Sequence, residues 1–188
     1  MNFDFTEEHL MIQESARDFA QNEIAPSAVQ RDKSAEFPYE IVKKMGELGF
    51  MGMMVSQDYG GAGLDTISYV LAMIEISKVD ASVGVIMSVN NSLVCYGLEK
   101  YGSDYIKEKY LVPLAKGEKL GAFALSEPEA GSDATKQKTM ADKDGDNYSL
   151  NGIKNWITNG VTADYVLVMA TTKKELAHKG ISTFVVER

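Results

Sequence analysis

The chain has 188 residues, of which 45% are hydrophobic and 24% are charged. This is the composition of an ordinary folded protein, and it excludes the disordered and fibrous classes. The formal net charge is −8 at pH 7. That charge argues against nucleic acid or an anionic membrane surface as the main partner, because both are bound largely through lysine and arginine.

Composition also limits metal chemistry and location. One cysteine and two histidines are too few for a Cys/His zinc site or an internal disulfide. No apolar run approaches the ~18–20 residues of a membrane span, since the longest, around Ala81–Val89, is interrupted by serine and glycine. Residues 1–4 do not begin a secretory signal. We therefore expect a cytoplasmic protein with no metal site and no membrane partner.

Residues 1–117 have the apolar spacing of α-helices. The segment 80–96 is apolar nearly all round, which predicts a helix buried on several sides. We expect these helices to form one bundle of about 115 residues. The first helix is expected to begin at Thr6, which can cap it, and to end at Pro26. The second is expected to begin at Pro38 and the third at Asp65 or Thr66. The fourth is expected to begin at Asp80, with Gly97 near its end, and the fifth to begin at Ser103 and to end at Gly117.

Residues 118–188 change to short segments rich in β-branched and aromatic side chains, separated by Asp/Asn-Gly turns. Their close spacing predicts an antiparallel sheet or barrel. The chain stops directly after an apolar strand, so we expect a truncated chain that holds only part of a β domain. The fold class is therefore α+β, an N-terminal helical bundle followed by an incomplete antiparallel β-barrel. The expected strands are 120–125, 135–141, 148–150, 153–158, 165–171 and 181–186.

The segment Ser126–Asp133 follows a predicted strand and combines proline, glycine, serine and aspartate. Such a loop can aim backbone N–H groups at an anion or a flat heterocycle. The same residues are also typical of a plain turn at the end of a strand. Ser126 is no candidate nucleophile, because it lies in no G-x-S-x-G elbow.

The segment Ile153–Gly160 carries the only tryptophan, Trp156, followed by Thr158. An indole face stacks on planar rings, and a threonine hydroxyl can donate to a ring nitrogen. The alternative is a tryptophan in the core of a sheet. The glycine-rich segment Tyr59–Asp65 precedes a helix but does not complete a phosphate-binding motif, and a tight connection between helices is the favoured interpretation.

The combination of these segments resembles the acyl-CoA dehydrogenase family. The resemblance rests on Asp58–Gly63, on Gly121–Asp133, and on Trp156–Asn159, whose tryptophan lies 24 residues after Ser132. The sequence of Ala122–Pro128 is most similar to that of the short-chain, or butyryl-CoA, branch of the family. The family architecture continues into the rest of a β-barrel and a C-terminal four-helix domain, which we expect to be absent from this chain.

The resemblance implies that FAD is the cofactor and that the two stretches fold together into a flat slot for its ring system. Leu125 and Ser126 would contact the flavin ring, and Ser132 would lie near the cofactor diphosphate and the acyl-CoA substrate. In the second stretch, Trp156 would pack on the ring and Thr158 would bond near N5. The residues implied to bind the cofactor are Phe123, Leu125, Ser126, Gly131, Ser132, Trp156, Ile157 and Thr158.

The family reaction removes an α-proton from an acyl-CoA thioester with a glutamate base while a β-hydrogen leaves as hydride. That base belongs to the C-terminal domain, so we expect no catalytic residue and no turnover in this chain. Glu127 belongs to the cofactor loop and does not replace the base. The implied partners of the whole protein are electron-transferring flavoprotein and further copies of itself. The alternatives are a flavin monooxygenase or nitroalkane oxidase on the same scaffold, or a non-catalytic module that binds FAD or a partner.

Overall fold

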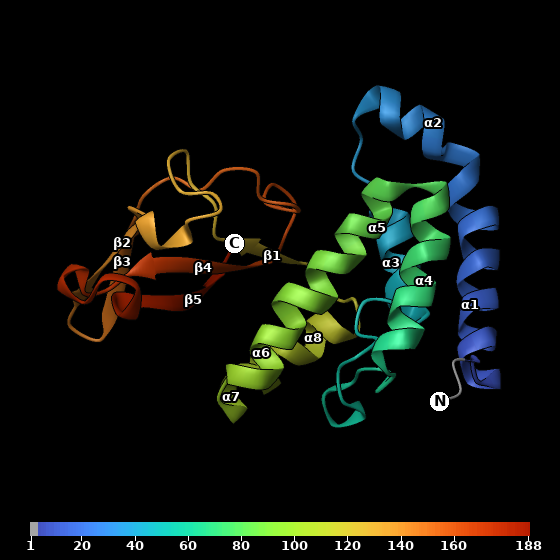
Figure 1. Cartoon of the computed structure of the whole chain (residues 1–188), viewed down its shortest axis with the longest axis horizontal. Helices are drawn as coiled ribbons and strands as arrows, with labels where there is room; N and C mark the ends of the chain where they lie inside the picture. Colours follow the sequence, from blue (N-terminus) through green and yellow to red (C-terminus); the bar gives the residue numbers. More distant parts are fainter. Residues whose placement is uncertain (1–3) are drawn as a thin grey trace. The chain divides into compact units, whose positions relative to one another are not determined.

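The computed structural model describes residues 4–188. The prediction about a secretory signal concerns residues 1–4, of which the first three lie outside the described residues. The chain divides into two compact units (Figure 1), one ending at Leu120 and the other comprising Gly121–Arg188. We call them the helical unit and the sheet unit. Each is described by itself.

The helical unit is built from consecutive helical segments with short connections. Side-chain caps begin several of them as the sequence predicts, because Thr6, Asp65, Asp80 and Ser103 each accept a hydrogen bond from a backbone N–H of the following turn. The segments are α1 (Glu7–Phe19), η1 (Ala20–Ile24), α2 (Ala25–Ser34), α3 (Tyr39–Glu47), η2 (Gln57–Tyr59), α4 (Thr66–Val79), α5 (Ala81–Ser88), η3 (Val89–Cys95), α6 (Tyr96–Tyr101), α7 (Asp104–Ile106), η4 (Lys107–Leu111) and α8 (Val112–Ala115).

The prediction that Pro26 ends the first helix is wrong. The π-helical segment η1 follows α1 without a break, and Pro26 lies in the first turn of α2, which continues to Ser34. The chain is already helical before Pro26, and the proline lies just after a π-helical segment, in which Ala25 N–H donates to Ala20 O and the regular α-helical hydrogen bonds are interrupted. Gly97 lies near the end of its helix, as expected, and the helix continues through α6 to Tyr101.

The segments α5, η3 and α6 form one helix of 21 residues, Ala81–Tyr101, with a mean hydropathy of 1.3. By length and composition alone this helix is apolar enough to cross a membrane, so the expectation that no run approaches that length is wrong. The serines and the glycine do not interrupt the helix. Half of the most apolar part of this helix is buried, as in the central helix of a bundle.

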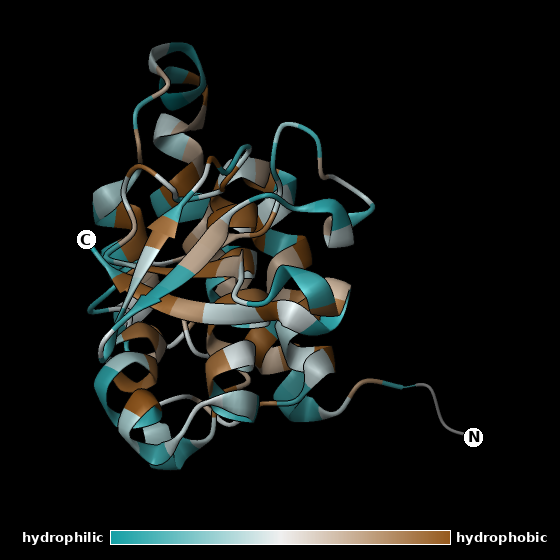
Figure 2. Cartoon of the chain, turned by 90° about the vertical axis from the view of Figure 1, so that its left-hand side faces the viewer, coloured by the Kyte–Doolittle hydropathy of each residue, from teal (hydrophilic) through white to brown (hydrophobic). Residues whose placement is uncertain are grey.

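The core of the helical unit lies where α1, α3, α4 and α5 meet, with α1 and α4 side by side (Figure 1). Polar and apolar residues share the same helices (Figure 2), as expected for segments that bury one face. The buried core contains Ala16, Phe19, Ala20, Ile24, Ile41, Val42, Met45, Phe50, Met51, Met53, Tyr69, Ala72, Ile76, Val83, Ile86, Met87 and Leu120.

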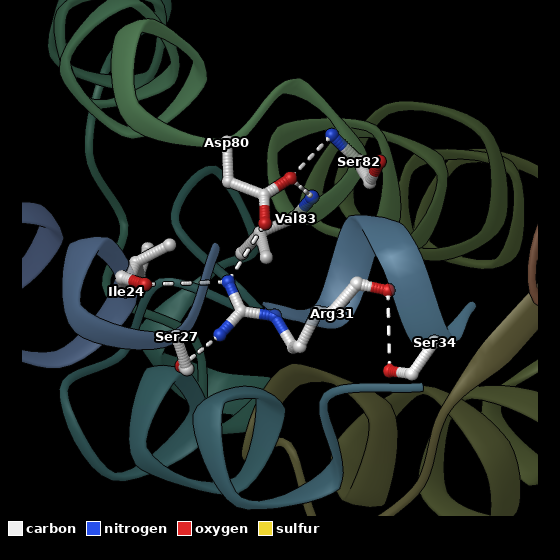
Figure 3. Close-up of polar contacts among 7 residues, drawn as sticks. All are labelled: Ile24, Ser27, Arg31, Ser34, Asp80, Ser82 and Val83. Atoms are coloured by element: carbon white, nitrogen blue, oxygen red, sulfur yellow. Dashed lines mark hydrogen bonds and ion pairs between the residues drawn. The ribbon is translucent and has the colours of Figure 1, made fainter. Parts of the chain in front are cut away.

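Two networks of polar contacts connect the helical segments of this unit. Asn91 is buried, accepts a hydrogen bond from Met53 N–H (2.8 Å) and donates to the carbonyls of Phe50 (2.8 Å) and Met87 (3.0 Å). In the second network the Arg31 guanidinium donates to the Asp80 carboxylate at 2.7 Å, while Asp80 caps α5 (Figure 3). Both networks join segments that are far apart in sequence.

The sheet unit holds a five-stranded sheet in which β1, β4, β2 and β3 are consecutive neighbours and β5 pairs with β4. β5 follows β4 along its whole length, so β1 and β2 share the opposite edge of β4. The segments are β1 (Gly121–Ala124), η5 (Ala134–Lys136), β2 (Met140–Asp144), β3 (Asn147–Asn151), β4 (Tyr165–Thr171), η6 (Lys174–Gly180) and β5 (Ile181–Glu187).

The sheet is mixed, and the prediction of an antiparallel barrel is to that extent wrong. β1 and β2 both run parallel to β4, whereas β2–β3 and β4–β5 are antiparallel. Parallel pairing needs a long crossover, and the chain between β1 and β4 supplies it. The predicted strand 135–141 forms only from Met140, because Ala134–Lys136 turn into η5.

Candidate functional site

The first candidate stretch leaves β1 and turns sharply. Glu127 N–H donates to Ala130 O at 2.9 Å, and Ala130 N–H donates back to Glu127 O at 3.2 Å. Pro128 and Glu129 form the exposed tip of this turn. Proline suits the second position of a four-residue turn, because its fixed φ is already that of the turn.

The second candidate stretch lies against the first, as the sequence predicts. Asn155 N–H donates to Ser126 O at 2.9 Å. The Lys154 ammonium group donates to Leu125 O at 3.0 Å. The two stretches are therefore joined at consecutive carbonyls, although about thirty residues of chain separate them.

The predicted strand 153–158 does not form. Residues 152–164 contribute no strand, and Asn155 N–H instead bonds Ser126 O in the loop after β1. Trp156 has a positive φ of 59° and its residue is 94% exposed. The interpretation of Trp156 as a core residue of a sheet is therefore wrong, and the indole is not enclosed by this chain.

The other predicted cofactor residues fall into two groups by exposure. Gly131 and Ser132 are exposed beyond the turn. The half-buried ones lie at the end of β1 or beside Trp156, namely Phe123, Leu125, Ser126, Ile157 and Thr158. Phe123 pairs with Leu167 of β4, which fixes the end of β1 from which the turn departs.

A buried ion pair, not predicted from the sequence, holds this region together. The Lys154 ammonium lies 2.9 Å from Glu127 Oε1, and the two side chains are only 10% and 5% exposed. Glu127 also accepts hydrogen bonds from the backbone N–H groups of Lys138 (2.5 Å) and Thr139 (3.0 Å). Burial by itself would raise the pKa of Glu127, but these donors outweigh it and lower the pKa to about 2.

This environment makes Glu127 a poor general base. A carboxylate whose pKa is about 2 holds a proton weakly at neutral pH, and its oxygens are already occupied by donors. The structure therefore agrees with assigning Glu127 to the loop rather than to proton transfer. Its partner could be recognised only in three dimensions, because a pair 27 residues apart leaves no periodic signal in the sequence.

Several features of the sheet unit are compatible with a bound group. Among the described residues, Gln137 Nε2 and Asn159 Oδ1 are buried side-chain atoms without a hydrogen-bond partner. Gly131 has no positive φ, and a Cβ added there would meet no atom within 4 Å. Neither the backbone nor the packing of this chain therefore requires glycine at position 131.

The glycine-rich segment of the helical unit behaves differently. Gly60 and Gly63 have φ values of 79° and 66°, and a Cβ on Gly61 would overlap the backbone of Val55. Each glycine has a reason within the chain itself. This favours the interpretation of a tight connection over that of a phosphate-binding loop.

Comparison with known proteins covers nearly the whole chain. Residues 6–118 match the model of the acyl-CoA dehydrogenase N-terminal domain, and residues 122–188 match that of the acyl-CoA dehydrogenase middle domain. The short-chain-specific acyl-CoA dehydrogenase of Clostridium acetobutylicum is 46% identical over 188 residues, covering 100% of this chain and 50% of that protein. The chain spans about half the length of the curated relatives it matches.

Solved structures agree with the sequence matches. Butyryl-CoA dehydrogenase from Megasphaera elsdenii has a TM-score of 0.95 at 40% identity, and the match covers 100% of this chain and 50% of that one. A glutaryl-CoA dehydrogenase from Mycobacterium smegmatis in complex with FADH2 has a TM-score of 0.91 at 36% identity, with 97% of this chain and 46% of that one covered.

Proposed function

Because the chain belongs to the acyl-CoA dehydrogenase family, we propose that it supplies the flavin-facing loops of a short-chain acyl-CoA dehydrogenase. The observation that carries the proposal is the joining of the two candidate stretches, with Asn155 bonded to Ser126 and the indole of Trp156 exposed next to them. An exposed indole on a strained backbone is costly to maintain without a partner, and a planar ring is the partner it suits.

FAD fits the residues at this place. Apolar walls come from Phe123, Leu125 and Ile157, and the placed hydroxyls come from Ser126 and Thr158. A flavin site needs this mixture of apolar surface and a few oriented donors. Gly131 supports the assignment, because open space in front of its backbone lets a bulky group approach closely.

The chemistry would be the oxidation of the Cα–Cβ bond of a short-chain acyl-CoA, for which bound FAD supplies the hydride acceptor. The residues of this chain bind and orient. Trp156 and Thr158 cover and bond the ring system, and Ser132 serves both the cofactor diphosphate and the acyl-CoA. We further propose electron-transferring flavoprotein as the electron acceptor of the whole protein, assembly with further copies of itself, and a cytoplasmic location.

The test uses the single tryptophan as a probe. FAD is titrated into the chain while Trp156 emission is recorded, because a flavin stacked on the indole quenches it. We expect saturable quenching, with an affinity weakened about tenfold in Thr158→Ala and in Ser126→Ala, since one hydrogen bond is worth ~1–1.5 kcal/mol. Thr183→Ala is the control, because Thr183 is exposed on β5 and its hydroxyl donates to Met169 Sδ, away from the two candidate stretches.

Two results would contradict the proposal. Trp156 emission that does not change with FAD, in a protein that purifies colourless, would favour the non-catalytic module. Equal weakening in Thr183→Ala would mean that the variants act through general destabilisation. A flavin monooxygenase or nitroalkane oxidase would be indicated instead if the reduced flavin of the whole protein reacted rapidly with oxygen and an acyl-CoA failed to reduce it.

A further inference from the structure

We propose that Lys154 is a positioning residue whose buried ammonium group, paired with Glu127, sets the place of the Trp156–Thr158 segment against Leu125–Ser126. The inference rests on the proposed function, because it concerns the order of the same surface. The juxtaposition that carries it is a single ammonium group in contact with three separate parts of the loop region.

The Lys154 ammonium has three N–H donors, and the structure provides three acceptors for them. These are Leu125 O at 3.0 Å, Glu127 Oε1 at 2.9 Å and Gln137 Oε1 at 2.9 Å. An ammonium group whose three donors are all bonded has no freedom left to rotate or shift. The ammonium group is therefore held at the end of β1, and the neighbouring backbone is held there as well, because Asn155 N–H donates to Ser126 O at 2.9 Å.

Glu127 links the Lys154 ammonium group to the residues that precede β2. Its carboxylate accepts hydrogen bonds from Thr139 N–H (3.0 Å), Thr139 Oγ1 (2.5 Å) and Lys138 N–H (2.5 Å). The ion pair thus joins the turn after β1, the approach to β2 and the Trp156 segment. Hydrogen bonds to ionised groups are about twice as strong as neutral ones, so this is the firmest polar link among these segments.

The Trp156 segment depends on such links because the sheet does not hold it. Residues 152–164 contribute no strand. Trp156 has φ 59°, a value that costs a bulky residue about 1–2 kcal/mol, and Asn159 has φ 64°, a conformation that asparagine adopts more readily. A strained backbone persists only when neighbouring contacts impose it. Lys154 and Asn155 bond immediately before Trp156 and supply those contacts on one side, and Asn159 supplies them on the other by donating to Gly121 O at 3.0 Å.

The experiment replaces the pair with neutral side chains of similar shape, in the variant Glu127→Gln/Lys154→Met. Replacing both partners of a buried ion pair avoids leaving one buried charge alone, and hydrogen exchange of β4 and β5 checks that the unit stays folded. The matched control is Glu129→Gln/Lys138→Met, which removes an ion pair of the same loop whose side chains are 70% and 72% exposed. Lys154→Arg, which keeps the charge, is the rescue variant.

Three measurements separate positioning from general stability. Time-resolved anisotropy of Trp156 without FAD reports the order of the segment, FAD titration reports binding, and hydrogen exchange of β4 and β5 reports the sheet. We expect faster local rotation of Trp156 and an FAD dissociation constant raised about tenfold, with exchange of β4 and β5 unchanged. The control should match the wild type, and Lys154→Arg should recover at least half of the lost Trp156 order.

The outcomes decide the proposal without ambiguity. Wild-type anisotropy in the double variant would overturn it. Loss of protection throughout β4 and β5 would overturn it as well, because the pair would then stabilise the whole unit. If the wild type itself does not bind FAD, the proposed function fails, while the anisotropy comparison still decides whether Lys154 positions the segment.

Discussion

The two units of this chain differ in how completely they satisfy their own polar groups. In the helical unit, Asn91 uses both ends of its buried amide on backbone groups of the same unit. In the sheet unit, Gln137 and Asn159 each keep one buried atom without a partner among the described residues, and the indole of Trp156 lies open. Among the described residues, the buried side-chain atoms without a hydrogen-bond partner all lie in the sheet unit, so this unit has hydrogen-bonding capacity that its own fold does not use.

This difference teaches where to look for function. A buried polar group that is fully bonded is accounted for by the fold, whereas one without a partner calls for a further explanation, such as an ordered water molecule, an ion or a bound group. The glycines follow the same division, since Gly61 is required by close packing and Gly131 is not. Substitutions should therefore reduce stability in the helical unit and reduce binding at the loops of the sheet unit.

The largest expected effect is that of Asn91→Ala. The change leaves Met53 N–H and Phe50 O buried without partners, and each such group costs about 1–3 kcal/mol. We expect a loss of about 4 kcal/mol in the free energy of unfolding, seen as faster hydrogen exchange in α4 and α5 (Figure 1). Asn22→Ala, at an exposed helical position, should change it by less than about 0.5 kcal/mol. If hydrogen exchange of α5 were as slow in Asn91→Ala as in the wild type, the proposed difference between the helical and sheet units would be contradicted.

A somewhat smaller loss is expected from Arg31→Met. Arg31 and Asp80 are nearly buried, with side chains 11% and 12% exposed, and Arg31 also donates to Ile24 O (Figure 3). Removing one partner of a buried pair costs about 3 kcal/mol, because it leaves a charge uncompensated. The double variant Arg31→Met/Asp80→Asn should regain most of this loss in urea unfolding. If the double variant were as unstable as the single one, the charge would not be the cause.

The dependence of stability on pH offers a test in both units. Hydrogen bonds from Arg17 and Lys78 lower the pKa of Glu75 from 4.5 to about 2, and the pKa of Glu127 in the sheet unit is also about 2. Because the folded-state pKa lies below the unfolded value, each group stabilises fully above about pH 4.5 and loses its contribution as the pH falls towards 2.

Glu75→Gln should therefore cost on the order of 2 kcal/mol at pH 7, a value reduced by the exposure of Arg17 and Lys78, and should flatten the acid dependence of α4 protection. Glu14→Gln, an exposed position on α1, is the control. A variant whose stability still falls as steeply as the wild type between pH 4.5 and 2 would show that another carboxylate carries the effect.

The helical unit could be predicted from local signals, and most of its helices begin where capping residues and apolar spacing place them. The prediction that the first helix ends at Pro26 failed for a local reason. The π-helical segment η1 leads directly into α2, so the chain stays helical through the proline. In the sheet unit, β4 forms over the predicted residues 165–171. Whether neighbouring strands run parallel or antiparallel could not be predicted from the alternation of apolar and polar residues, because both kinds of pairing show the same pattern.

The candidate site could be predicted only in outline. Sequence motifs brought Ser126 and Trp156 to notice, and the structure places their segments together. The strand assigned to 153–158 is wrong because Trp156, in its middle, has φ 59°, which lies outside the β region, and this could not be read from the residue type. The Glu127–Lys154 pair was missed since its members are ordinary charged residues whose importance comes only from burial. The roles of the individual residues toward FAD stay predictions.

The smallest expected effect on stability gives the sharpest test of the comparison, and it comes from Gly131→Ala. Gly131 has no positive φ and open space in front of it, so the added methyl should change the unfolding free energy by less than about 0.5 kcal/mol. FAD affinity should fall about tenfold, because the methyl occupies the space that a bound group needs. Gly145→Ala is the matched control, since its surroundings are equally open but its φ is +58°. Strain there should cost about 1 kcal/mol of stability and leave FAD titration unchanged. The reverse result would be a Gly131→Ala variant that is unstable yet binds FAD as the wild type does. It would mean that glycine at position 131 is needed for the fold, as Gly61 is in the helical unit, and not for binding.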